Sequence, residues 1–195
     1  MGILKLFIAC YLIVGASYSM VKLDEETCHT YEKTLTEKSD SEEQFTLALC
    51  YFNGSGVRRS EAEAFKWFKR SARKGNADAQ YRVADSYRFG KGVEKNMSQA
   101  IQWYKSAAMQ GDTFAQFLLG QHYSYGDGVR QDKAVAFKWY KMGAVDGNAL
   151  LQYKLGCCYL KGDGVKKDKA EAIKWLKLSA NQGHEDARKL LNSLE

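Results

Sequence analysis

Four copies of a glycine-rich motif are the first candidates for chemistry in this sequence. The motif Gly-x-Gly-Val begins at Gly54, Gly90, Gly126 and Gly162. Glycine-rich loops in front of helices can hold phosphate groups with backbone N–H groups, but a dinucleotide fingerprint needs a third glycine three residues further on. Those places hold Arg59, Lys95, Gln131 and Lys167. We therefore interpret the motif as a turn, in which glycine adopts a positive φ and the valine packs toward the core.

Other catalytic chemistry is not indicated. The three histidines, His29, His122 and His184, have no partner at metal-ligand spacing. No Gly-x-Ser-x-Gly nucleophile motif occurs, and acidic residues are scattered rather than paired. The sequence predicts no catalytic residue, no metal site and no cofactor.

The glycine motifs recur every 36 residues, and other residues keep the same interval. The four tryptophans are Trp67, Trp103, Trp139 and Trp175. A fixed period of this size is typical of stacked helical units that bury a shared core between neighbours. We interpret the tryptophans as a core ladder, because each has alanines near it on the same predicted helix.

Each unit contains two predicted helices with defined ends. Residues that commonly cap helix N-termini precede the second helix in every copy: Ser60, Asn96, Asp132 and Asp168. Glycines follow that helix where a left-handed C-terminal residue is expected: Gly75, Gly111, Gly147 and Gly183. The fold class is predicted to be all-α, an α/α solenoid (superhelix) of four 36-residue helix-turn-helix repeats with degenerate N- and C-terminal capping helices.

The same period sets the expected division of the chain. Residues 20–40 are a degenerate N-terminal capping helix, and residues 185–195 a C-terminal one. The repeats are residues 41–76, 77–112, 113–148 and 149–184. Such atypical ends close the core of a solenoid.

Residues 1–19 are predicted to be a secretory signal peptide. Lys5 precedes an apolar run over residues 6–16, and Ser17 and Ser19 then offer a small-residue cleavage site. An uncleaved anchor is the alternative, although the run is shorter than the ~20 residues of a spanning helix. Lipid attachment at Cys10 is another. We expect an exported protein, periplasmic or secreted, or in the endoplasmic-reticulum lumen for a eukaryotic source, without an integral membrane span after cleavage.

The charge of the chain favours acidic partners. The formal net charge is +6 over 195 residues, and basic proteins attract anionic surfaces. Nucleic acid is not expected, because no nucleic-acid-binding motif appears and an exported protein rarely meets it. The oligomeric state stays open.

The cysteines bear on the same question of compartment. Cys50 and Cys158 occupy equivalent positions three repeats apart, too far for the ~7 Å limit on the Cα distance of a disulfide. Cys28 and Cys50 are the plausible bridge, between the capping helix and the first repeat. The alternative, that both are free thiols, stays open at this point.

The repeat pattern resembles the Sel-one-like repeat (SLR) family. The residues that carry the resemblance are Ala79-Gln80-Tyr81, Leu119-Gly120, Tyr123, Gly126-x-Gly128-Val129, Asp132, Ala136, Trp139-Tyr140 and Gly147. It covers residues 40 to 195 in four copies. The resemblance implies a tetratricopeptide-like fold and a non-enzymatic adaptor function, with a protein or peptide partner.

Some cysteine-rich bacterial members of that family have been described as β-lactam-binding or β-lactamase proteins. They carry one cysteine on each helix of a repeat. The matching positions here hold Gln44, Gln80, Gln116 and Gln152, with Ala72, Ala108, Ala144 and Ala180. A β-lactam enzyme of this type is the alternative function, and the missing cysteines count against it.

The resemblance also implies that the first helices line the concave side, where a partner would bind. On each first helix, the residues at positions i, i+4, i+7 and i+11, counted from its second residue, lie on one face. The predicted partner-binding stripe, taken from the second to the fourth repeat, consists of Arg82, Asp85, Phe89, Phe114, Leu118, Gln121, Tyr125, Lys154 and Lys161. Its aromatic centre has the composition of an interaction hot spot; the alternative is that neighbouring helices cover these side chains.

Two further sets of cations follow the period. A basic ridge in the turns consists of Arg58, Arg59, Lys95, Arg130, Lys166 and Lys167. It offers a second alternative function, association with an anionic polysaccharide or the cell envelope, although solvated turn residues explain it equally well. A lysine ladder on the second helices, Lys69, Lys105, Lys141 and Lys177, is interpreted as a soluble outer surface.

Overall fold

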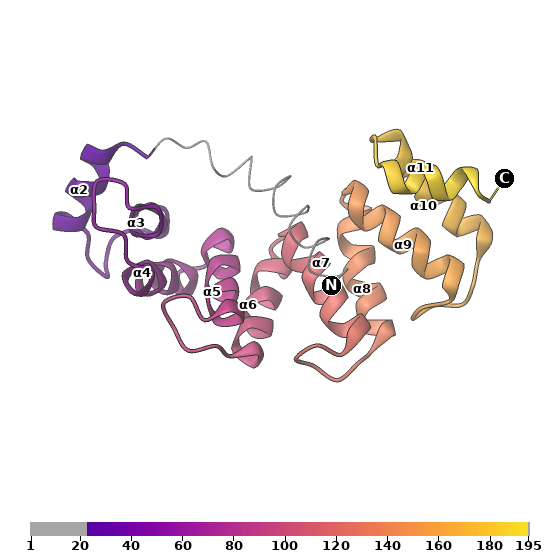
Figure 1. Ribbon diagram of the computed structural model, residues 1–195, viewed down its shortest axis with the longest axis horizontal. Coiled ribbons are helices and arrows are strands. Elements are labelled where there is room, and N and C mark those ends of the chain that lie inside the picture. The colour runs from indigo at the N-terminus through magenta and orange to yellow at the C-terminus, as the bar shows by residue number, and fades with distance from the viewer. Residues whose placement is uncertain (1–22, 195) are drawn as a thin grey trace.

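The computed structural model describes residues 23–194, which form ten helices and no β-strand. In chain order these are α2 (Glu25–Thr34), α3 (Ser41–Asn53), α4 (Glu61–Arg73), α5 (Ala77–Phe89), α6 (Met97–Met109), α7 (Thr113–Tyr125), α8 (Lys133–Val145), α9 (Ala149–Lys161), α10 (Lys169–Asn181) and α11 (Glu185–Asn192). They follow one another along an open arch from α2 to α11 (Figure 1). Each helix packs mainly against its neighbours in the sequence. The predicted all-α solenoid is confirmed, and the predicted signal peptide lies outside the described residues.

The second helices begin where the capping residues predict. Side-chain oxygens of Ser60, Asn96, Asp132 and Asp168 accept the backbone N–H three residues further on, at 3.2, 3.0, 3.0 and 2.9 Å. Each bond satisfies a backbone donor that has no partner inside the helix. The recurrence of the cap therefore fixes the start of α4, α6, α8 and α10.

The two glycines of each Gly-x-Gly-Val turn have different roles. The first ends the preceding helix in a left-handed conformation, as at Gly90, with φ +74°. The second also has a positive φ, +69° at Gly92, and it lies against the first turn of the preceding second helix. A Cβ on Gly92 would stand 2.1 Å from the backbone oxygen of Glu61. This glycine therefore permits close contact between neighbouring repeats as well as the turn.

The core ladder of the second helices lies one residue beyond the tryptophans. Trp67 is buried, but Trp103, Trp139 and Trp175 are only half-buried, at the edge of the core. The residues that follow them are the more deeply buried ladder: Phe68, Tyr104, Tyr140 and Leu176. The half-buried tryptophans pack against the edge of this core. The predicted tryptophan ladder therefore lies on the core side of the second helices, but the next residue along the chain is the more deeply buried one.

The glutamines of the first helices bind the backbone of the preceding second helix. The Nε2 atoms of Gln80, Gln116 and Gln152 donate to the carbonyl oxygens of Ala72, Ala108 and Ala144, at 3.2, 3.0 and 3.2 Å. All three glutamines are buried. These glutamine and alanine positions thus hold a hydrogen bond between successive repeats.

The two ends of the described chain are closed by short helices, as the period predicts. At the N-terminal end, α2 carries Cys28, which forms a disulfide with Cys50 of α3 across a Cα–Cα distance of 5.7 Å. Both cysteines are fully buried. At the other end, Ala187 of α11 is buried against the last repeat. Of the two possibilities for Cys28 and Cys50, the structure has the bridge, and Cys157 and Cys158 are free thiols.

Candidate functional site

Two exposed aromatic side chains stand at equivalent positions of consecutive repeats. Phe89 ends α5 and Tyr125 ends α7, with exposed fractions of 50% and 77%. Both precede the left-handed glycine that ends their helix, Gly90 and Gly126. Each is the last residue of its helix, so both rings lie at the same end of their first helices.

The structure separates the predicted stripe into buried and accessible members. Asp85 and Leu118 are buried, since neighbouring helices cover the middle of the stripe. The other members keep some exposure: Arg82, Phe89, Phe114, Gln121, Tyr125, Lys154 and Lys161. Phe114 packs edge-on against Tyr81, with ring centroids 6.1 Å apart. The accessible surface is therefore narrower than the sequence pattern.

Basic side chains lie against the rings at the α3–α5 end of this stripe. The Lys91 ammonium is 5.9 Å from the ring centroid of Phe52 and 5.5 Å from that of Phe89. The Arg88 guanidinium lies 4.9 Å from the Phe89 ring, and that of Arg82 lies 5.8 Å from the Phe52 ring. At exposed sites, the attraction between a cation and the face of an aromatic ring is modest. Together they make a surface that is both aromatic and positively charged.

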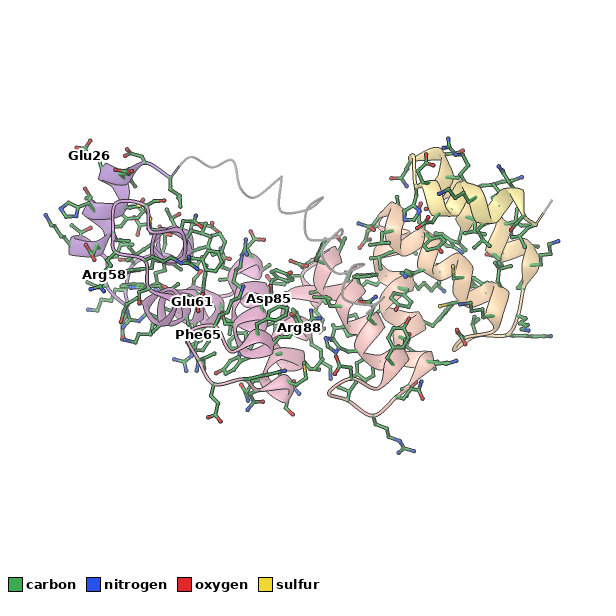
Figure 2. All side chains as sticks on the ribbon, in the orientation of Figure 1. Glu26, Arg58, Glu61, Phe65, Asp85 and Arg88 are labelled. Atoms are coloured by element: carbon green, nitrogen blue, oxygen red, sulfur yellow. A yellow bond between two sulfur atoms is a disulfide. The ribbon has the colours of Figure 1, made fainter. Side chains whose placement is uncertain are left out.

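A buried polar cluster lies close to these basic side chains. The Tyr104 hydroxyl of α6 donates to the Asp85 carboxylate of α5 at 2.5 Å. Burial raises the pKa of Asp85, while the bond from Tyr104 and the nearby charge of Arg88 oppose the rise. Asp85 and Arg88 lie near each other on α5, towards the middle of the arch (Figure 2). Asp85 therefore links α5 to α6.

His122 of α7 stacks on Tyr104, with ring centroids 6.2 Å apart. Its Nδ1 lies 2.8 Å from the carbonyl oxygen of Asp127, which can only accept, so Nδ1 carries the proton in the neutral ring. Within residues 23–194, its Nε2 is buried without a hydrogen-bond partner. Burial lowers the pKa of His122, against the opposing effect of the bond to Asp127. The repeat pattern does not predict this cluster, because Asp85, Tyr104 and His122 do not stand at equivalent places of their repeats.

The lowered pKa of His122 predicts acid sensitivity. The unfolded state binds this proton near pH 6.5 and the folded state only at lower pH, so stability is lost as pH falls below about 6.5. His184 has a lowered pKa as well, through burial. We expect His122→Gln to reduce the loss by up to about 1.4 kcal/mol per pH unit, and the double change with His184→Gln to reduce it further. Urea unfolding at pH 7.5, 6.5 and 5.5 measures this, and an unchanged pH slope in His122→Gln would contradict the role of His122.

The residues of the predicted basic ridge are all exposed in the turns between paired helices. These turns occur once in each repeat along the solenoid. In the first of them, Arg59 lies 3.5 Å from the Glu61 carboxylate. Exposed pairs of this kind contribute little to stability. The basic ridge is thus accessible to an anionic ligand, and its contacts do not indicate which kind of anion it would bind.

Two open depressions lie on the surface of the described residues. One is lined by Tyr123, Val129, Arg130, Gln131 and Asp132 beside the third turn. Over residues 23–194 no group of three or more His, Cys, Asp or Glu side chains is placed to hold a metal ion. Within the same residues, none of the helices has the length and hydropathy that crossing a bilayer requires.

Comparison with known proteins assigns the repeats. The family model described as the Sel1 repeat matches residues 44–76, 77–112, 113–148 and 149–184. The chain belongs to the Sel1 repeat family. Members of this family are generally scaffolds for protein interactions and are typically not enzymes. The resemblance seen in the sequence is confirmed.

Solved Sel1 repeat structures agree with this assignment. An SLR-fold protective antigen of uropathogenic Escherichia coli is 34% identical, with a TM-score of 0.76 over 79% of this chain and 33% of that one. A Sel1 repeat protein of Oxalobacter formigenes is 37% identical, with a TM-score of 0.74 over 80% of this chain and 45% of that one. The chain thus spans less than half the length of these two relatives. No curated protein is similar enough in sequence to count as a match.

Cysteine rich protein B of Helicobacter pylori shares the fold alone. It is 21% identical, with a TM-score of 0.52 over 65% of this chain and 96% of that one. At the glutamine positions described above, this Sel1 repeat chain lacks the paired cysteines. The likeness therefore transfers no activity.

Proposed function

We propose that this Sel1 repeat chain is a non-enzymatic adaptor that binds a protein or peptide segment along the first helices. The binding surface in this proposal consists of the accessible members of the stripe: Arg82, Phe89, Phe114, Gln121, Tyr125, Lys154 and Lys161. The observation that carries it is the exposure of Phe89 and Tyr125 at equivalent places on α5 and α7. Aromatic anchors at regular spacing suit an extended ligand that passes several repeats.

The charge around the rings indicates the chemistry of the ligand. Lys91 and Arg88 lie against Phe89, and Lys154 lies 5.6 Å from the ring centroid of Phe117. An acidic segment with apolar side chains would complement both the cations and the rings. We infer such a segment as the partner.

An exported compartment completes the proposal. The Cys28–Cys50 disulfide supports it, because disulfides persist in oxidising compartments and are rare in the cytosol. The signal-like pattern of residues 1–19 points the same way. The periplasm or the extracellular medium is the compartment we propose.

Peptide selection with the full chain as bait tests the site. The tightest peptide from a displayed library is measured against wild type and against Phe89→Ala/Tyr125→Ala. Since hot-spot side chains contribute about 2 kcal/mol or more, we expect at least a roughly 30-fold weaker Kd. Both rings are exposed, so the double variant should keep its helix content and stability.

The matched control is Met109→Ser/Val145→Ser, which removes two exposed apolar side chains from second helices instead. It should bind the peptide like wild type. A double ring variant that binds within about threefold of wild type would reject the first-helix surface.

A further inference from the structure

The second helices expose one face that the proposed adaptor site does not use. In α8 this face consists of Ala134, Lys138, Lys141, Met142 and Val145, all of them exposed. Their spacing places them on one side of the helix. Equivalent positions of α6 and α10 are exposed too, apart from a half-buried Lys105. We call this the outer face of α6, α8 and α10.

A row of apolar side chains crosses the outer face. Met109 of α6, Met142 and Val145 of α8 and Leu178 of α10 have exposed fractions of 76%, 42%, 64% and 48%. Met109 and Val145 are equivalent positions, as are Met142 and Leu178. Within residues 23–194 these are four of the six large hydrophobic side chains that are exposed. The row is therefore a concentration of exposed apolar surface across three consecutive repeats.

Lysines accompany the row on the same face. They are Lys105, Lys138, Lys141, Lys174 and Lys177. Neither α6 nor α8 contains an acidic residue, and the Glu171 carboxylate of α10 is paired with Lys174. In the described part of the chain, Lys138, Lys141 and Lys177 form no ion pair within 4 Å. The outer face thus carries an uncompensated positive charge beside its apolar row.

Long cations mixed with exposed Met, Val and Leu suit one kind of surface. Anionic lipid headgroups attract lysines, and apolar tips enter the boundary between headgroups and acyl chains. A soluble anionic polymer would gain from the lysines but not from the apolar row. A rigid protein partner would have to supply a pocket for each tip, because hot-spot side chains bind in pockets, whereas a bilayer deforms around them.

We propose that the outer face of α6, α8 and α10 docks the protein onto an anionic phospholipid membrane. Lysine stems reach along the surface while their ammonium groups meet phosphate oxygens. Met109, Met142, Val145 and Leu178 enter the interface without a spanning helix. Docking by the second helices leaves the first-helix stripe open, so this role is separate from the proposed capture of a peptide.

Vesicle co-sedimentation of the full chain tests the proposal. Vesicles of phosphatidylcholine with about one third phosphatidylglycerol are compared with pure phosphatidylcholine, at low and high salt. Binding contributed by the apolar N-terminal run is common to all variants and is measured on the neutral vesicles. We expect preferential binding to the anionic vesicles that weakens as salt rises, since exposed charges are screened.

Three variants separate the contributions. The apolar variant replaces the four row residues with serine, the charge variant is Lys138→Gln/Lys141→Gln/Lys177→Gln, and the control is Phe89→Ser/Tyr125→Ser on the first helices. We expect at least a roughly tenfold loss of anionic-vesicle affinity in the first two, given about fivefold per lysine near such a surface, and none in the control. Helix content by circular dichroism confirms that each variant is folded.

Two results would overturn the proposal. One is an apolar variant that binds anionic vesicles as wild type does. The other is binding of soluble polyglutamate with the affinity found for the vesicles, which would assign the face to an acidic protein or polymer. Loss of peptide capture with intact vesicle binding, or the reverse, distinguishes the failure of one surface from the failure of the other.

Discussion

Replacing Gly92 with alanine should destabilise the solenoid by about 3 kcal/mol. Gly92 has φ +69°, which costs an alanine about 1–2 kcal/mol. Its new Cβ would also lie 2.1 and 2.4 Å from the backbone oxygen and carbon of Glu61. Since a backbone cannot swing aside as a side chain does, α4 and the turn must move apart, and overpacking of this kind costs about 1–3 kcal/mol. Chemical denaturation followed by helical circular dichroism measures the loss.

Gly111→Ala is the matched control, because Gly111 also has a positive φ, +93°, but no atom within 4 Å of its Cβ position. It should lose only the conformational part, about 1–2 kcal/mol. Equal losses in the two variants would mean that the close contact with Glu61 contributes nothing.

The difference between these two glycines illustrates what the sequence could predict. Both keep the 36-residue period, and the sequence predicts a positive φ for both, which the structure confirms. The contact of Gly92 with Glu61 joins residues of different repeats, 31 positions apart in a different element. Periodicity identifies which positions are constrained, but only the packing of one repeat on the next says by what.

Helix ends were the most predictable feature, because a cap is a local interaction. Asp24 stands one 36-residue period before Ser60, and in the structure its carboxylate accepts the Thr27 N–H at 2.9 Å. This cap sets the start of α2. At the other end, Ala187 stands two periods after Ala115 and is buried as Ala115 is.

The candidate site was less predictable, because burial depends on which helix covers which. Phe89 and Leu118 belong to one face by helical spacing, yet Phe89 is exposed and Leu118 is buried. Helical spacing locates a face to about a quarter turn, whereas the superhelical stacking decides which part of it stays open. The apolar row of the outer face escaped the sequence interpretation for a related reason: the lysine ladder was recognised by its period, while Met109, Met142, Val145 and Leu178 occupy two different positions of the repeat.

Removing the disulfide should free the N-terminal cap. The bridge closes a loop between residues 22 positions apart, Cys28 and Cys50, and such a constraint on the unfolded chain is worth about 3 kcal/mol in the chain-entropy model. In a solenoid each helix depends on its neighbours, and α2 has α3 alone to pack against extensively. The loss should therefore fall on α2 first: in Cys28→Ala/Cys50→Ala, amide hydrogen exchange should accelerate strongly in α2, moderately in α3, and not in α9 or α10.

Treatment with a reductant gives a control for this experiment, because the two free thiols have no disulfide that it could cleave. Cys157 and Cys158 lie in α9, and burial raises the pKa of Cys158 to about 12, so this thiol stays protonated and unreactive at neutral pH. Treating wild type with a reductant should reproduce the exchange pattern of the double variant and add nothing to that variant itself. Faster exchange spread evenly from α2 to α10 would mean that the cap is coupled to the whole solenoid. Unchanged exchange in α2 would mean that packing against the core, to which Leu23 and Tyr31 contribute, holds the cap without the disulfide.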